Sequence, residues 1–147
     1  MYIKVYGYAL RYDTPLHHGK VKKGALMRDP ETNRLYACRN DVPVYFGDYH
    51  MPGNYGPPDG FASVFLRRDG IYSVTTLRQP VNLNALKSCK IGLYAYKIVR
   101  NKYDEITDGY IGYININASS NVHPIDKIVQ CEPFKEPVIL YENTEKR

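Results

Sequence analysis

The chain has 147 residues, of which 44% are hydrophobic and 24% are charged, so its composition excludes a disordered chain and suffices for one hydrophobic core. Its formal net charge of +5 favours anionic partners such as nucleic acid or an acidic protein surface. No apolar run is long enough to span a membrane and the start lacks an apolar signal segment, so we expect an intracellular (cytoplasmic, reducing) or virion protein without a membrane partner.

Short strands separated by turns are predicted for the first third of the chain. Residues 2–10 alternate as a half-buried strand does, and shorter strands are predicted over 21–27, 34–38 and 42–46. Pro43 favours an edge position for the last of these, because proline has no N–H to donate to a neighbouring strand.

Two hairpins are predicted further along. An Asp-Gly pair between two apolar runs is typical of a tight hairpin turn in which both residues take a positive φ. Such pairs occur at Asp69-Gly70 and at Asp108-Gly109. They predict a turn over 67–70 between strands 61–66 and 71–77, and a turn over 101–109 between strands 91–99 and 110–117.

The remaining segments are a short helix over 81–89, a strand or short helix over 125–130 and a terminal strand over 138–141. Many short strands with Gly and Pro at the turns predict an all-β fold of eight or so strands. Its architecture would be a sandwich of the jelly-roll kind or a partly open barrel, with at most one or two short helices. We expect one β-rich domain over 1–141 and a charged C-terminal tail over 142–147.

Residue types that carry catalysis or bind metals are sparse. The three cysteines form no Cys-x-x-Cys pair, which favours free thiols in a reducing compartment and predicts no metal site. The four histidines lack the helical spacing of metalloprotease ligands. No glutamate lies between Glu31 and Glu105, so a catalytic carboxylate pair is poorly supplied. The sequence therefore favours a protein with no cofactor and no enzymatic activity.

A tyrosine-rich surface and an unusual loop are the positive signals for binding. The chain has 15 tyrosines and no tryptophan, and tyrosine offers a large contact area at low entropic cost. Residues 47–60 hold four glycines and three prolines, which predicts a long loop carrying Tyr49, His50 and Tyr55. We therefore predict a non-enzymatic binding or assembly protein, of the kind found among viral (phage-type) structural and accessory components. A protein partner or self-association would bury this loop.

An alternative function is the binding of a nucleotide or nucleic acid by the basic N-terminal third. Cations interleave with tyrosines at the start of the chain, which suits a surface on which bases stack. The interleaved residues are Lys4, Tyr6, Tyr8, Arg11 and Tyr12. The candidate anion-binding residues are Arg11, Lys20, Lys22, Lys23, Arg67 and Arg68.

Three segments resemble the motifs of the ADP-ribosyltransferase family. Leu16-His17-His18-Gly19 resembles the first motif, a His-Gly pair, and Leu35-Tyr36-Ala37 resembles the second. Glu105 or Asp104 is similar to the acidic third motif.

This resemblance implies a third function, that of a small enzyme that consumes NAD. His18 would hold a ribose, Tyr36 would stack on nicotinamide, and Glu105 would support an oxocarbenium-like transition state. The chain departs from the family at Lys20, which replaces a small hydroxyl residue, and at Pro43 and the following loop, which replace a helix.

Overall fold

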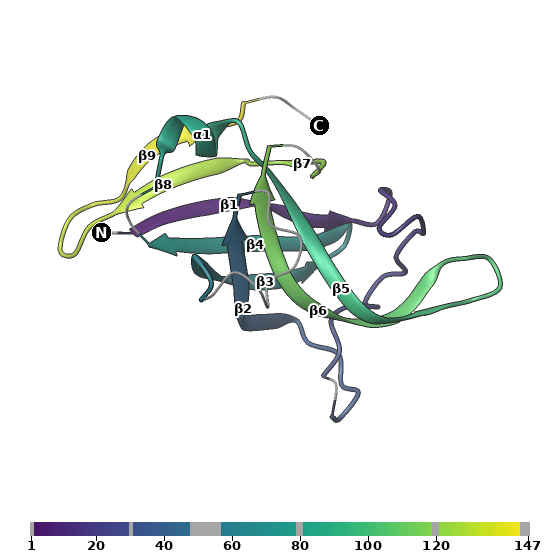
Figure 1. Ribbon diagram of the computed structural model, residues 1–147. Helices are drawn as coiled ribbons and strands as arrows, with labels where there is room; N and C mark the ends of the chain where they lie inside the picture. Colours follow the sequence, from purple (N-terminus) through teal and green to yellow (C-terminus); the bar gives the residue numbers. More distant parts are fainter. Residues whose placement is uncertain (1, 30, 48–56, 79–80, 119–120, 145–147) are drawn as a thin grey trace.

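A computed structural model describes residues 2–29, 31–47, 57–78, 81–118 and 121–144 (Figure 1). The strands of this part of the chain are β1 (Tyr2–Arg11), β2 (Cys38–Phe46), β3 (Gly60–Arg67), β4 (Gly70–Arg78), β5 (Lys90–Arg100), β6 (Ile106–Asn117), β7 (His123–Pro124), β8 (Lys127–Cys131) and β9 (Val138–Glu142). One short helix, α1 (Leu83–Lys87), lies between β4 and β5.

All of these strands belong to one sheet, in the order β7-β5-β6-β2-β3-β4-β1-β8-β9. The pairs are antiparallel except for β2 and β6, which run parallel. The sheet curls into a half-barrel. The predicted all-β class is therefore confirmed. Of the two predicted architectures the partly open barrel is the one found, because a single curled sheet carries every described strand.

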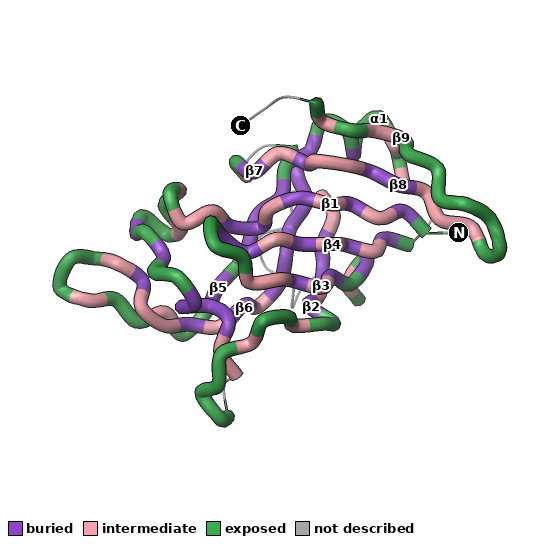
Figure 2. Tube along the Cα trace, turned by 180° about the vertical axis from the view of Figure 1, so that it is seen from behind, coloured by how far each residue is buried: buried purple, intermediate pink, exposed green. Residues whose placement is uncertain are grey.

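The hydrophobic core lies on the inner face of the curled sheet. Along β1, the buried Ile3 and Val5 alternate with the partly exposed Lys4 and Tyr6, as a period of two requires. Figure 2 shows this alternation of buried and intermediate positions along the strand. Gly7 marks a close approach of β1 and β5, since a Cβ there would lie 2.7 Å from Cδ1 of Ile91. Helix α1, within the predicted range, covers the core with the fully buried Leu86.

The predicted edge position of Pro43 is wrong, because β2 lies between β3 and β6 in the sheet. Strand β2 pairs with β6 only from Val44 to Phe46. At Pro43 only β3 lies alongside, so the absent N–H removes no hydrogen bond to β6.

Two of the predicted short strands are also wrong. Residues 21–27 form turns in which Met27 N donates to Gly24 O at 3.1 Å, and Ala25, Leu26 and Met27 are all buried. Three consecutive buried side chains fit a turn pressed into the core better than a strand with one solvent-facing side. Of residues 34–38, only Cys38 belongs to a regular strand.

The first predicted hairpin is confirmed, although its turn differs from the expected kind. Arg68 and Asp69 connect β3 to β4, and neither they nor Gly70 have a positive φ. Glycine is needed at position 70 for another reason. A Cβ there would lie 2.1 Å from the carbonyl oxygen of Leu10, because β1 packs closely against the start of β4.

The second hairpin is confirmed with a shorter loop than predicted. Strand β6 begins at Ile106, so Asp108 and Gly109 lie within the strand and not in the turn. The Asn101 side chain closes the loop by accepting from Glu105 N at 3.0 Å and donating to Glu105 Oε1 at 2.9 Å. These hydrogen bonds between the Asn101 side chain and Glu105 close the loop between β5 and β6. The loop is therefore set by Asn101, and not by the Asp108-Gly109 pair on which the prediction relied.

The terminal strand β9 is confirmed and ends at Glu142, one residue past the predicted boundary. Asn143 N then donates to Asp126 O at 2.6 Å. The organisation as one domain with a charged tail stays a prediction.

Candidate nucleic-acid interface

Aromatic and cationic side chains gather on the side of the sheet that faces away from the core, over β3, β4, β1 and β8. We call this surface the outer face. In Figure 2 these strands lie side by side, and residues of intermediate exposure alternate with buried ones. The outer face consists of Phe61, Phe65 and Arg67 on β3, Tyr72, Val74, Thr76 and Arg78 on β4, Tyr2, Lys4, Tyr6 and Tyr8 on β1, and Lys127 on β8.

Strand register brings the rings of three strands into one row. Tyr8 pairs with Tyr72, and Tyr72 pairs with Phe65. The rings of Tyr8 and Tyr72 meet edge to face, with centroids 5.0 Å apart. This geometry suits the quadrupoles of aromatic rings and holds both side chains in place.

Arg11 joins the outer face through a bulge in β1. An odd-numbered residue of β1 would normally point inward, but the register shifts between Tyr8 and Leu10. Ala9 and Leu10 are consequently both buried, and Arg11 falls on the same side as Tyr8. The guanidinium carbon of Arg11 lies 4.9 Å from the centre of the Tyr8 ring.

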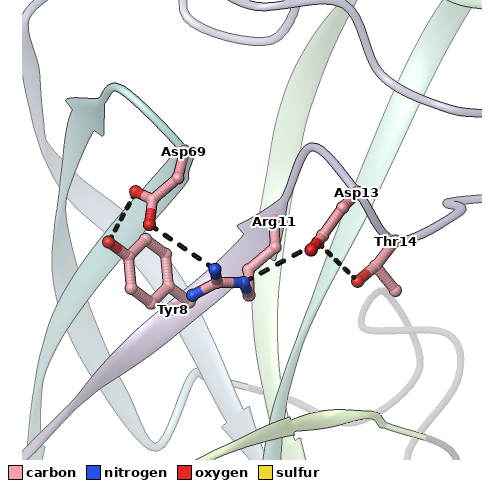
Figure 3. Close-up of polar contacts among 5 residues, drawn as sticks. All are labelled: Tyr8, Arg11, Asp13, Thr14 and Asp69. Carbon is pink, nitrogen blue, oxygen red and sulfur yellow. Dashed lines mark hydrogen bonds and ion pairs between the residues drawn. The ribbon is translucent and has the colours of Figure 1, made fainter. Parts of the chain in front are cut away.

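Asp69 in the β3–β4 turn ties this end of the outer face together (Figure 3). Tyr8 donates its hydroxyl to Asp69 Oδ1 at 2.6 Å, and Arg11 Nη2 lies 3.6 Å from Asp69 Oδ2. The Tyr8 hydroxyl lowers the pKa of Asp69 below its usual value, with smaller help from the two nearby guanidinium groups. The carboxylate thus stays charged and positions Arg11, whose Nε also lies 3.7 Å from Asp13 Oδ1.

Two more cations lie over rings of the outer face. The guanidinium carbon of Arg67 is 3.8 Å from the centre of the Tyr72 ring, and Lys127 Nζ is 4.6 Å from the centre of the Tyr6 ring. Burial raises the pKa of Tyr72 to about 12, and the charge and hydrogen bond of Asp126 add to this. Tyr72 is therefore a neutral phenol at physiological pH, with a polar hydroxyl and an apolar ring.

A shallow pocket of about 350 Å³ crosses the other end of the outer face. Its volume is at the small end of the range for small-molecule sites. Lys4 and Arg78 form no ion pair with any described residue, so both charges are available to a ligand. The side chains that line it belong to Tyr2, Lys4, Asp41, Phe61, Ser63, Val74, Thr76 and Arg78.

The predicted anion-binding residues fall into two groups. Arg11, Arg67 and Arg68 come together at the β3–β4 turn. Lys20, Lys22 and Lys23 are exposed on a different segment, which bonds to the start of β6 through Lys20 O and Lys22 N. The basic N-terminal third therefore contributes to two places on the molecule.

The other residues of the predicted stacking surface do not all lie on one surface, and the residues of the predicted loop are not described. Lys4, Tyr6 and Tyr8 lie on the outer face, whereas Tyr12 packs against the core and its hydroxyl accepts from Gly24 N at 3.2 Å. The loop residues Tyr49, His50 and Tyr55 lie outside the described residues.

Of the segments that resemble ADP-ribosyltransferase motifs, the structure brings the first and the third side by side: a Cβ on Gly19 would lie 2.5 Å from Asp104 O, and Ile106 N donates to Lys20 O at 2.8 Å. His17 and His18 occupy the two central positions of a tight turn with positive φ, closed by Leu16 and Gly19. Tyr36 donates to Asp29 Oδ2 at 2.6 Å, and Glu105 accepts from Asn101 at 2.9 Å. Among the described residues no hydrogen bond joins the side chains of His18, Tyr36 and Glu105, and NAD binding stays a prediction.

Several members of the outer face escaped prediction. Tyr2 continues the alternation of β1 and could have been included from the sequence alone. Tyr72, Arg78 and Lys127 lie on β4 and β8, whose position beside β1 depends on contacts between distant parts of the chain, and no local signal indicates it. Phe61 lies on β3, one strand beyond β4.

The residues that the structure describes contain no group of three or more His, Cys, Asp or Glu side chains placed to hold a metal ion. Within the same residues, no helix has both the length and the apolar character needed to cross a membrane. Comparisons with models of known protein families, with curated proteins and with solved structures gave no significant match.

Proposed function

We propose that the protein binds single-stranded nucleic acid on its outer face. The observation that carries the proposal is the interleaving of rings and cations on four adjacent strands, with Arg67 placed 3.8 Å from the centre of the Tyr72 ring. Proteins that bind single strands combine aromatic rings, on which bases stack, with a cationic path for the phosphates. A duplex would not use the rings, because its bases are already stacked on one another.

The distribution of charge favours a phosphate path along Lys4, Arg78 and Lys127. Two acidic groups beside the outer face, Asp69 and Asp126, accept hydrogen bonds from tyrosine hydroxyls of the sheet. Their charges hold the rings in place at the β3–β4 end, whereas Lys4 and Arg78 at the other end have no described acidic partner.

Fluorescence anisotropy with a labelled oligothymidylate of about 12 nucleotides tests the proposal, since this length covers the site of a small β domain and forms no secondary structure. We expect wild-type binding, and weaker binding by Arg67→Gln. Lys102→Gln is the matched control, because Lys102 also lies over an exposed ring, that of Tyr103 at 5.1 Å, but away from the outer face. Absence of wild-type binding, or equal losses in both variants, would refute the proposal.

A second candidate function, self-association, is favoured by the last strand of the sheet. Among the described strands, β9 pairs with β8 alone, and its residues Val138 and Ile139 are 56% and 57% exposed. Exposed apolar edge strands tend to pair with another chain. If β9 of one copy paired antiparallel with β9 of a second copy, the β9 edge of each copy would be covered, and a two-fold axis would relate the two copies.

Light scattering of the purified protein tests self-association. We expect a dimer that Ile139→Lys converts to a monomer, while Val122→Lys, at a similarly exposed apolar site, leaves the dimer intact. A monomeric wild-type protein would eliminate this candidate and leave nucleic-acid binding unaffected.

A further inference from the structure

Asp41 is an unpaired carboxylate at one side of the shallow pocket. A bulge in β2 between Arg39 and Val42 interrupts pairing with β3 and places Asp41 at a positive φ of 62°. Its side chain forms no hydrogen bond or ion pair with any described residue. Asp41 is also the only acidic residue among the described side chains that line this pocket.

The opposite side of the pocket is cationic. Asp41 comes from β2, whereas Lys4 comes from β1, and the two strands are three strand spacings apart, or about 14 Å. Between them lie Phe61, which is 40% exposed, and Thr76, with which it is paired. The pocket thus has an acceptor at one end, a ring in the middle and cations at the other end, where Arg78 joins Lys4.

We propose that this pocket selects guanine in the bound strand, an inference that rests on the proposed function. Guanine presents two adjacent donors on its Watson–Crick edge, N1–H and the N2 amine, and a carboxylate can accept both at once. The base would stack on Phe61 while Lys4 and Arg78 bind the flanking phosphate. Adenine, cytosine and thymine each place an acceptor next to their donor on this edge, which Asp41 would repel.

The test compares labelled oligothymidylate with the same oligomer carrying one central deoxyguanosine or one deoxyinosine. We expect about 5- to 150-fold tighter binding with guanine, the range of a bidentate base contact. Inosine, which lacks the N2 amine, should fall between guanine and thymine. This ligand series tests the contact without altering the protein.

The variant Asp41→Asn then tests whether Asp41 is the residue that recognises guanine. Asparagine tolerates the same positive φ, so the bulge should persist, and the preference for guanine should fall below about twofold while binding of oligothymidylate is retained. Asp104→Asn is the control, because Asp104 is an acid at a φ of 64° in the β5–β6 loop. It should leave the preference unchanged.

The outcomes separate this inference from the proposed function. Binding of oligothymidylate without a preference for guanine, or a preference that survives Asp41→Asn, would overturn the guanine pocket alone. Absence of binding to any oligomer would overturn both proposals. Free GMP should bind far more weakly than the guanine-containing strand, and equal affinities would overturn the strand as the ligand.

Discussion

Replacing Phe61 by leucine should separate binding from stability. The ring is 40% exposed on β3 and lies across from Thr76, so leucine can retain the apolar contact with the sheet. An apolar exchange of this size lowers the free energy of unfolding by less than about 1.5 kcal/mol. Loss of one stacked base removes about 1–3 kcal/mol of binding free energy. Affinity for the oligothymidylate should therefore fall about 5- to 150-fold.

Anisotropy titration and urea denaturation of the same protein samples measure the two effects. Tyr103→Leu is the control, because Tyr103 is 71% exposed in the β5–β6 loop and also lies beside a lysine, yet is not on the outer face. It should bind as the wild type does. A Phe61→Leu protein that folds and binds with unchanged affinity would refute stacking at this position.

Three further predictions concern the construction of the outer face. Gly70→Ala should lower the free energy of unfolding by about 1–3 kcal/mol, because the new Cβ would lie 2.1 Å from a backbone oxygen of β1. Arg68→Ala in the same turn is the control and should change this free energy by about 0.5 kcal/mol at most. Denaturant titration measures both. The raised pKa of Tyr72, about 12, means that the folded protein favours the neutral phenol; this stabilisation is complete below about pH 10 and is lost as the pH rises toward 12. Tyr72 should therefore ionise late in an ultraviolet titration. Tyr72→Phe should remove this part of the loss of stability at alkaline pH. Tyr8→Phe should raise the pKa of Asp69 toward its usual value, because the depressed pKa owes most to the Tyr8 hydroxyl; this stabilisation is present above the ordinary carboxyl pKa and lost as the pH falls through the depressed value, and an NMR titration of the carboxyl carbon would follow it.

Alternation along one strand was readable from the sequence and predicted part of the outer face. Lys4, Tyr6 and Tyr8 occupy every second position and lie on one side of β1 as expected. Arg11 shares that side only because of the bulge after Tyr8, and Tyr12 leaves it for the core. A period of two holds within a regular strand, but nothing local in the sequence indicated the bulge.

Strand neighbours were beyond prediction because they depend on contacts between distant segments. Lys127 lies over Tyr6 because β8 pairs with β1, although the two strands are at opposite ends of the chain. The grouping of Arg11 with Arg67, apart from Lys20, has the same origin. Residue type indicated which side chains could bind anions, and topology decided which of them share a surface.

Single-residue rules failed where a neighbouring strand imposed its own requirement. Pro43 was expected at a sheet edge, yet the parallel partner of β2 begins only at Val44. The Asp-Gly rule located the first hairpin correctly, but Gly70 is needed for the approach of β1 and not for a positive φ. At both positions the residue type is explained by the neighbouring strand, β6 at Pro43 and β1 at Gly70. The linear sequence does not show which strands are neighbours.

The most direct test of the central claim is the salt dependence of oligothymidylate binding by the wild-type protein. Each phosphate contact on a single strand contributes about −0.7 to the slope of log K against log salt concentration. Phosphate contacts by Lys4, Arg78 and Lys127 predict a slope of about −2. A slope near zero, or no binding at low salt, would contradict the assignment of the outer face as a nucleic-acid interface.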